Sequence, residues 1–194
     1  MEIKPRFELS FVNISQLEKK LKFCESNEIN KINIPCKGVI KKNFYIETVE
    51  YINKHHKNLD VVYHYSLYHQ YSKNKNNSYL DFLNFINNYA YHKNIKVLLI
   101  SGSNKKTNFD VIDVLDNLKN ERNLDIDLGV AYNPYLGRYY NIFEERQRYE
   151  KKISSSFIKS VWLQFGTDIK LLEKEFEFIK NIKKRQKYNL FGSL

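Results

Sequence analysis

Short apolar runs of strand length alternate with longer amphipathic stretches along the whole chain, and this alternation constrains the fold more than any other feature. In the amphipathic stretches apolar residues recur every three or four positions, as at Leu80, Leu83 and Ile86, which predicts helices. A helix between two strands lets them pair in parallel, because a parallel crossover needs about a dozen residues or more. The sequence therefore predicts an α/β protein with a parallel sheet.

The alternation gives six strand–helix units and the start of a seventh strand. Strands are predicted at residues 6–12, 31–34, 61–65, 96–100, 126–131, 160–165 and 188–194. Helices are predicted at residues 15–26, 44–56, 78–92, 109–122, 142–154 and 168–182. Ser15 and Glu18 have the spacing of a capping box, and Asp168 is placed to cap the last helix. Since the 194 residues hold 6 Gly, 3 Pro and no long linker, we expect residues 1–194 to form a single domain.

Two architectures suit this order of elements: an open doubly wound sheet, or a (β/α)8 TIM barrel that is incomplete. An open sheet that binds nucleotides should carry a Gly-rich phosphate loop after an early strand, and neither GxGxxG nor GxxxxGKS/T occurs. Residues 102–107 match such a loop only in part, because no Gly precedes Lys105. We therefore favour an unfinished TIM barrel, and we expect a second copy or another chain to cover its open edge.

Composition argues against several classes of protein. The most apolar runs have only strand length, so we predict no membrane span and no membrane partner. The first residues, Met1 to Pro5, do not begin a signal peptide. The 2 Cys form no CxxC pair, which argues against both a disulfide scaffold and a zinc site. Together these features predict a protein of the reducing cytoplasmic compartment.

The charge balance raises the question of a nucleic-acid partner. The 32 Lys and Arg outnumber the 22 Asp and Glu, which gives a net charge of +10. The lysines are spread along the chain except at residues 183–187, and only Tyr188 adjoins that cluster as a stacking aromatic residue. We interpret the charge as a solvated basic surface and expect no nucleic-acid partner. The alternative is a basic binding module at residues 183–187, with steeply salt-dependent binding.

Polar residues near the predicted strand ends are the first candidates for a site, because parallel α/β proteins place their chemistry there. Glu8 is expected on the interior face of the first strand, where a carboxylate must be paired or functional. His64 lies near the end of the third strand, and the five-residue step to His69 predicts no metal site. Gln164 shares a strand face with Trp162, and its amide can donate and accept, as a pterin edge requires. A purely structural role is the alternative for each of them.

In chain order, six segments resemble those of the methylenetetrahydrofolate reductase family, which are flavin enzymes built on a (β/α)8 barrel. The segments are Phe7–Phe11, His64, Asn94–Ser103, Gly129–Pro134, Lys151–Lys152 and Val161–Asp168. The resemblance implies that Glu8 is the general acid that assists opening of the folate one-carbon bridge, and that Gln164 binds the pterin. It also implies that FAD contacts His64, Ser103, Ala131, Asn133 and Lys152, with Lys152 on the cofactor phosphate.

The activity implied by this resemblance belongs to folate one-carbon metabolism. NAD(P)H would reduce FAD, which would reduce methylenetetrahydrofolate to methyltetrahydrofolate. The chain departs from the family where Ser101 and Ser103 replace an Arg and an Asp, since that Asp lies beside the flavin. Asn133 replaces a Tyr, and the His expected after Pro134 is absent. The alternative is therefore a catalytically silent homologue that binds a ligand or a partner.

Overall fold

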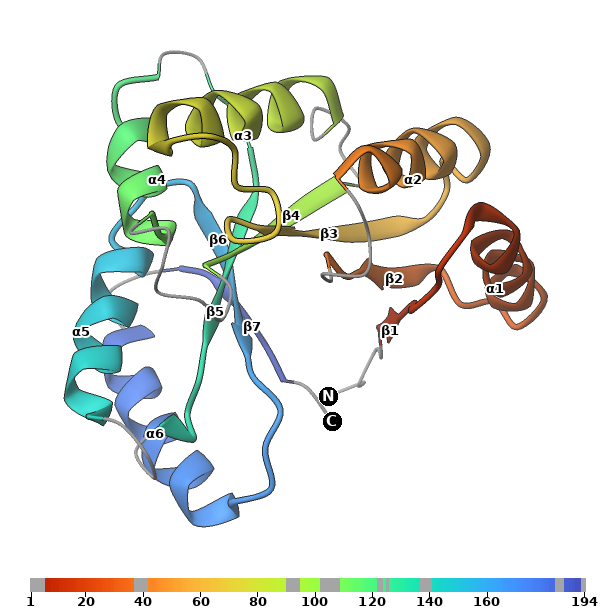
Figure 1. Ribbon diagram of the computed structural model, residues 1–194. Helices are drawn as coiled ribbons and strands as arrows, with labels where there is room; N and C mark the ends of the chain where they lie inside the picture. Colours follow the sequence, from red (N-terminus) through yellow and green to blue (C-terminus); the bar gives the residue numbers. More distant parts are fainter. Residues whose placement is uncertain are drawn as a thin grey trace. The chain divides into compact units, whose positions relative to one another are not determined.

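The computed structural model describes residues 6–36, 42–89, 95–101, 109–121, 124, 126–136, 141–183 and 187–192. Within these residues seven strands alternate with six helices from the first strand to the last (Figure 1). The chain divides into two compact units, Met1–Asn108 (the first unit) and Phe109–Leu194 (the second unit). In the described residues no helix is both long enough and apolar enough to cross a membrane.

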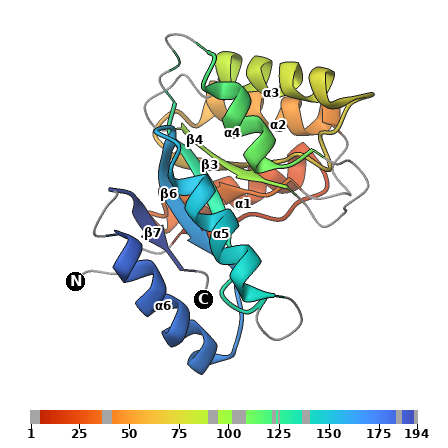
Figure 2. The same ribbon diagram turned by 90° about the vertical axis from the view of Figure 1, so that its left-hand side faces the viewer.

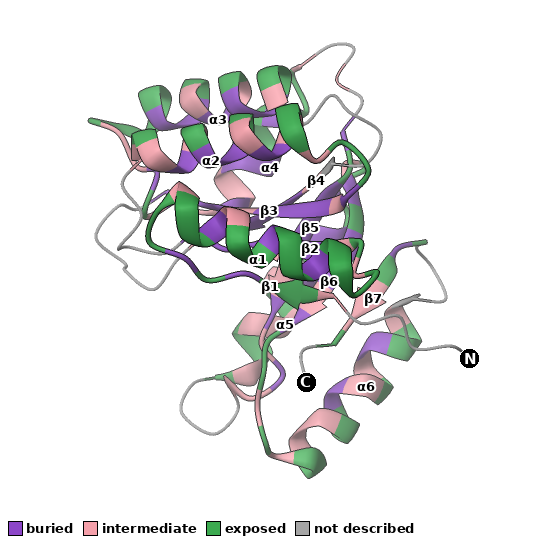
Figure 3. Ribbon diagram, turned by 90° about the vertical axis from the view of Figure 1, so that its right-hand side faces the viewer, coloured by how far each residue is buried: buried purple, intermediate pink, exposed green. Residues whose placement is uncertain are grey.

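The first unit contains a parallel sheet in which consecutive strands are neighbours, in the order β1-β2-β3-β4. Its strands are β1 (Phe7–Glu8), β2 (Lys31–Ile34), β3 (Asp60–Ser66) and β4 (Ile95–Ile100). Its helices are α1 (Ile14–Ser26), α2 (Lys42–His55) and α3 (Lys75–Tyr89). Buried and exposed residues alternate along each helix, as expected of helices that cover a sheet with one side (Figure 3).

The core of the first unit is rich in aromatic side chains. Tyr65 on β3 packs against Phe82 and Phe85 on α3, with ring centroids 5.1 and 5.0 Å apart. Tyr63, two residues earlier on the same strand face, also contacts Phe85, so this face of β3 is the one that the helices cover. The hydroxyl of Tyr45 on α2 donates to the main-chain oxygen of His64 at 2.6 Å. His64 itself lies on the opposite face of β3, between the two tyrosines in sequence.

The second unit repeats the same construction with the strand order β5-β6-β7, again parallel. Its strands are β5 (Leu128–Tyr132), β6 (Ile158–Leu163) and β7 (Asn189–Phe191). Its helices are α4 (Val111–Leu118), α5 (Ile142–Ile153) and α6 (Ile169–Lys183). Helix α5 lies against both β5 and α4 (Figure 2). The register between β5 and β6 shifts between Leu128 and Gly129.

A buried ion pair holds the helices of the second unit to its sheet. Glu175 on α6 is 1% exposed and binds the guanidinium of Arg146 on α5 at 2.7 and 2.9 Å. It also accepts a hydrogen bond from the Tyr132 hydroxyl at the end of β5. The Tyr132 ring packs on that of Tyr149, with centroids 4.7 Å apart. This face of β5 is therefore the helix-covered face, and by strand alternation Gly129 and Ala131 lie on the other.

Most of the predicted elements are confirmed, including the parallel pairing and the seventh strand. Asp168 caps α6 as predicted, since its carboxylate accepts from the main-chain nitrogen of Leu171 at 3.1 Å. The predicted capping box at Ser15 is wrong: α1 begins one residue earlier and is capped by Asn13, which accepts from the Gln16 nitrogen at 2.9 Å. The first strand is also shorter than predicted: it covers Phe7 and Glu8, and one further bond joins the Leu9 nitrogen to the Asn33 oxygen of β2 at 3.0 Å.

Candidate functional site

Gln164 is held at the carboxyl end of β6 by the sheet itself. Its main-chain nitrogen donates to the oxygen of Tyr132 at 2.9 Å, which extends the pairing of β5 and β6 by one residue. Strand alternation places its side chain on the face of Trp162, away from the helix-covered Leu163. That side chain is exposed, and within the described residues its amide makes no hydrogen bond. The fold therefore fixes the backbone of Gln164 and leaves its side-chain amide exposed.

An aromatic pair lies on the same face of the sheet, one row before Gln164. Ala131, Trp162 and Phe191 are direct neighbours across β5, β6 and β7. The rings of Trp162 and Phe191 stack with centroids 4.3 Å apart and planes 15° apart. Both side chains are half-buried, and the indole nitrogen of Trp162 donates to the Ser160 hydroxyl at 3.1 Å. The indole therefore leans toward the amino end of β6, with one face of the ring against Phe191.

The loops that follow β5 and β6 pack on one another beside Gln164. A Cβ at Gly166 would lie 2.3 Å from the Tyr135 ring, so that ring rests directly on the main chain of Gly166. Asn133 holds the β5 loop in shape, because its side-chain oxygen accepts from the Tyr135 nitrogen at 2.9 Å. Phe165 and Ile169 nearby are 60% and 68% exposed. The segment after Gln164 thus carries exposed apolar side chains as well as the half-buried Asp168.

Lys152 and Ala131, both predicted flavin contacts, are brought together by the structure. Lys152 lies on α5 with its side chain 8% exposed, and its ammonium donates to the Ala131 oxygen at 3.0 Å. Burial lowers the pKa of Lys152, and the Glu145 carboxylate 3.5 Å away opposes that shift. Arg148 joins Glu145 to Asp110, at 3.8 and 2.8 Å. The Lys152 ammonium is thus an internal tie between helix and strand.

Glu8, the predicted general acid, lies at the carboxyl end of β1 in the first unit, and its side chain is exposed. The buried charge of this strand belongs to Arg6, whose side chain is 8% exposed and pairs with Asp60 at 2.9 Å. Burial of Asp60 opposes its ionisation, but the hydrogen bond and charge of Arg6, aided by Lys96, hold its pKa below the ordinary value. The interior position expected for Glu8 is therefore occupied by a different ion pair.

The remaining predicted flavin contacts are distributed between the two units. His64 is half-buried on β3 in the first unit, whereas Ala131, Asn133 and Lys152 belong to the second. Ser103 lies outside the described residues. The ammonium of Lys152 and the amide oxygen of Asn133 already bind groups of the chain itself. Lys152 and Asn133 are thus each engaged within the second unit.

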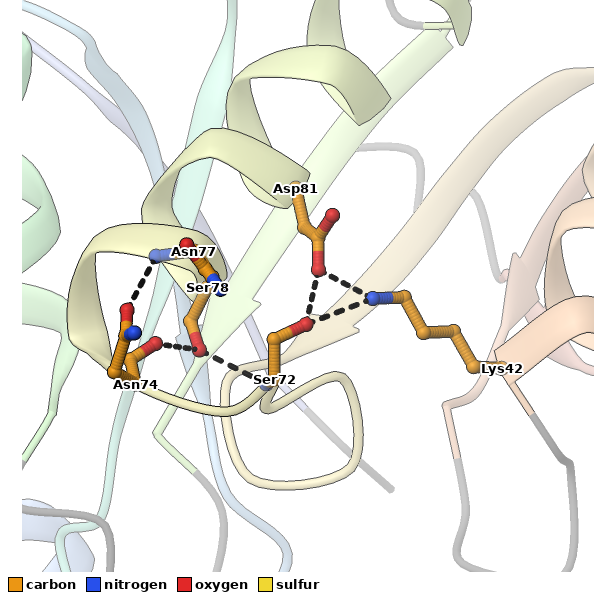
Figure 4. A network of polar contacts seen from close by, with 6 residues as sticks. All are labelled: Lys42, Ser72, Asn74, Asn77, Ser78 and Asp81. Carbon is orange, nitrogen blue, oxygen red and sulfur yellow. Dashed lines mark hydrogen bonds and ion pairs between the residues drawn. The ribbon is translucent and has the colours of Figure 1, made fainter.

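A polar network that sequence analysis missed follows β3 in the first unit (Figure 4). The Ser72 hydroxyl donates to the Asp81 carboxylate, and the Lys42 ammonium binds both that carboxylate and, at 3.1 Å, the hydroxyl. The main-chain nitrogen of Ser72 donates to the Ser78 hydroxyl at 2.9 Å. Burial of Asp81 opposes its ionisation, but the bonds from Lys42 and Ser72 keep its pKa below the ordinary value. The network connects the starts of α2 and α3.

Cys36, just after β2, is also bound within the first unit. Its sulfur accepts from the Gln70 amide at 3.3 Å, and both side chains are buried. Burial raises the pKa of the Cys36 thiol, despite the hydrogen bonds it receives from Gln70 and from the Ser66 main chain. A protonated, enclosed thiol is a poor nucleophile, so Cys36 is a packing residue.

Within the described ranges, no group of three or more His, Cys, Asp or Glu side chains is arranged to hold a metal ion. The sequence matches no protein-family model, and it has no significant match to a curated protein.

Proposed function

We propose that this chain is a ligand-binding α/β protein that takes a folate-type heterocycle at the carboxyl end of β6. The observation that carries the proposal is Gln164, whose backbone is held by the pairing with β5 and whose side-chain amide is exposed and without a hydrogen bond in the described chain. An amide can donate and accept at once, which matches the edge of a pterin ring.

The proposed function is binding without flavin chemistry, which corresponds to a silent homologue of the reductases. The state of Lys152 supports this choice, because a cation buried against a main-chain oxygen and a carboxylate has little to offer a phosphate. The half-buried Asn133 is likewise engaged in its own turn. These two internal bonds weigh against FAD more than the substitutions at Ser101 and Ser103 alone would.

The second candidate function is the reductase activity itself, with FAD as cofactor and NAD(P)H as electron donor. It is favoured by Glu8, whose exposed carboxyl group lies at the carboxyl end of β1, where parallel α/β enzymes place catalytic groups. A carboxylic acid there could protonate the opening one-carbon bridge of the folate. This candidate requires that the chain bind flavin through contacts other than Lys152.

For the fold, we propose that both units belong to one (β/α)8-type barrel and act as one domain. The proposal is supported by the parallel strands of each unit, which follow one another in chain order with a helix after each of β1 to β6. An unpaired edge strand is a template for pairing with another chain, and we propose a second copy of this chain as that partner. Sedimentation equilibrium of the purified protein would reveal that second copy as a dimer.

Two measurements on purified protein separate the two functions. The absorbance spectrum shows whether a flavin is bound, and calorimetric titration with tetrahydrofolate shows whether a folate binds. We expect a colourless protein that binds tetrahydrofolate, with affinity lowered roughly tenfold in Gln164→Ala by the loss of about one hydrogen bond. Flavin bands that disappear on denaturation, together with turnover that Glu8→Gln abolishes, would establish the second candidate instead. A colourless protein that binds no folate would contradict both.

A further inference from the structure

A cavity lies at the amino ends of β2 and β3, between the end of α1 and the end of α2. Its volume is about 350 Å³, which is within the range of small-molecule sites. The α1 side contributes Glu25 and Glu28 to its wall, and the α2 side contributes His56 and Asn58. All of these residues belong to the first unit. The cavity therefore shares no residue with the site at Gln164.

Glu25 holds the His56 ring in one orientation beside this cavity. The Nδ1 atom of His56 lies 2.7 Å from the Glu25 carboxylate, and the His56 side chain is 9% exposed. In the neutral ring this hydrogen bond keeps the proton on Nδ1 and leaves Nε2 as an acceptor. Nε2 makes no hydrogen bond to the described residues, and it is open to solvent rather than enclosed. The ring is thus fixed in place with one acceptor available.

The backbone of Glu28 adopts a conformation that glycine usually supplies. Its φ is 56°, the only positive φ of a residue other than glycine in the described chain. The Ile29 nitrogen donates to the Cys24 oxygen at 2.8 Å, which closes the end of α1 as a Schellman motif. Glycine is preferred at the position of Glu28 in this motif. A glutamate there lowers stability, and it adds a carboxylate to the wall of the cavity.

The charges around the cavity favour a cation over an anion. Two carboxylates, those of Glu25 and Glu28, stand against the ammonium of Lys57. Lys57 is exposed, and its long side chain can extend into solvent. Both α1 and α2 end at the cavity, so the negative ends of two helix dipoles add to the carboxylates. Because no described group of three side chains is arranged for a metal ion, an organic cation fits better than a metal.

We propose that this cavity binds a small organic cation with N–H donors, in the form of a guanidinium or a primary ammonium group. The carboxylates of Glu25 and Glu28 balance its charge, and charge-assisted hydrogen bonds are roughly twice as strong as neutral ones. The Nε2 atom of His56 accepts a further N–H. The volume of about 350 Å³ limits the ligand to a small molecule. This site does not depend on the folate site, so either proposal can fail without the other.

The probe for this site is agmatine, which carries a guanidinium group at one end and an ammonium group at the other. Calorimetric titration of the whole chain measures its affinity. N-butylurea, which resembles the guanidinium end but is uncharged, is the neutral comparison. The variants are Glu28→Gln, Glu28→Gly and His56→Phe. The control is Glu47→Gln, at an exposed glutamate of α2 that does not line the cavity.

We expect agmatine to bind the wild-type protein and N-butylurea to bind at least roughly tenfold more weakly, because it lacks the charge. Glu28→Gln should lower the affinity for agmatine roughly tenfold through the loss of one charge-assisted hydrogen bond. Glu28→Gly should weaken binding as much while raising the melting temperature by about 2 °C, since glycine adopts this backbone without strain. A more stable variant that binds poorly cannot owe its defect to unfolding.

The other two variants separate the ring from the general charge of the unit. His56→Phe keeps an aromatic ring but removes the Nε2 acceptor, so it should lower the affinity roughly fivefold. Glu47→Gln removes the same charge as Glu28→Gln at a place outside the cavity and should match the wild type.

Four results would overturn the inference. Calorimetry that shows no binding of agmatine would remove the site. Equal affinity in the wild type, Glu28→Gln and Glu28→Gly would mean that agmatine binds elsewhere. N-butylurea binding as tightly as agmatine would mean that the cavity does not recognise charge. Binding of Zn²⁺ that Glu28→Gln and His56→Phe abolish, without binding of agmatine, would make the cavity a metal site instead.

Discussion

Polar side chains at the carboxyl end of β3 bind one another, whereas the polar side chain at the carboxyl end of β6 binds nothing in the described chain. In the first unit Ser72, Lys42 and Asp81 form a closed set of hydrogen bonds. In the second unit the backbone of Gln164 is paired with β5, but its side-chain amide is exposed and makes no hydrogen bond to the described residues. A polar group that is satisfied internally stabilises the fold, whereas an exposed one that bonds only to water is available for a ligand. The two strand ends therefore suit different roles.

The largest effect on stability is expected when the buried ion pair of the second unit is broken, which tests how much an internally bonded polar group stabilises the fold. Glu175→Gln should lower the free energy of unfolding by about 3 kcal/mol, because it leaves the Arg146 guanidinium without a carboxylate. Urea denaturation measures this loss. The matched control is Glu177→Gln, which breaks an exposed pair with Lys180 on the same helix and should change little. Equal effects of the two substitutions would contradict the conclusion that the buried Glu175 carboxylate stabilises the second unit through Arg146.

A smaller loss of stability is expected when the half-exposed network of Lys42, Ser72 and Asp81 is broken. Asp81→Asn should cost about 1 kcal/mol, since Lys42 and Ser72 lose a charged acceptor but retain access to water. The pKa of Asp81 is lower in the folded protein than its ordinary value of 3.8. Its contribution to stability is therefore complete above 3.8 and is lost as the pH falls from there through the lower folded value.

Asp81→Asn should accordingly reduce the acid sensitivity of the protein, and thermal melts of both proteins between neutral pH and pH 3 would show it. The difference in melting temperature between wild type and variant should narrow as the pH falls. A difference that stays constant across this range would mean that the carboxylate charge contributes nothing to the network.

The smallest effect on stability is expected at Gln164. This result would sharpen most the contrast between the polar side chains that follow β3 and the one that follows β6. Gln164→Ala removes an exposed side chain that makes no hydrogen bond to the described residues, so the melting temperature should stay within about 1 °C of the wild type. Binding of tetrahydrofolate should weaken in the same variant, as proposed above. A clear loss of stability would instead show that the amide has a structural partner and would remove the main support for the site.

The alternation of strands and helices could be predicted because each element carries its own period and its own stop signal. Strand β2 was predicted to the residue, since Pro35 ends it. The start of α1 could not be predicted to the residue, because Asn13 and Ser15 are both good capping residues and local preference does not choose between them. The choice is made by Gln16, whose nitrogen donates to Asn13 and whose side chain accepts from the Val12 nitrogen at 3.2 Å.

The site could be predicted only where strand alternation was sufficient. Placing Gln164 and Trp162 on one face needs only the two-residue period of β6. The hydrogen bond from Lys152 to the Ala131 oxygen could not be predicted from the sequence, because the two residues are 21 positions apart and lie on different elements. The network of Ser72 was missed for the same reason, since Lys42 lies 30 residues from it in the sequence. Contacts between elements decide which polar groups remain available to a ligand, and the periodicity of the sequence does not predict those contacts.

The position of the single tryptophan also has a consequence for how unfolding of this chain is observed. Trp162 belongs to the second unit, whereas the aromatic cluster around Tyr65 and Phe85 belongs to the first. Indole emission therefore reports the loosening of the second unit alone, while far-ultraviolet circular dichroism averages the helices of both. Coincident transitions by the two probes would indicate one cooperative folding unit, and separate transitions would indicate two.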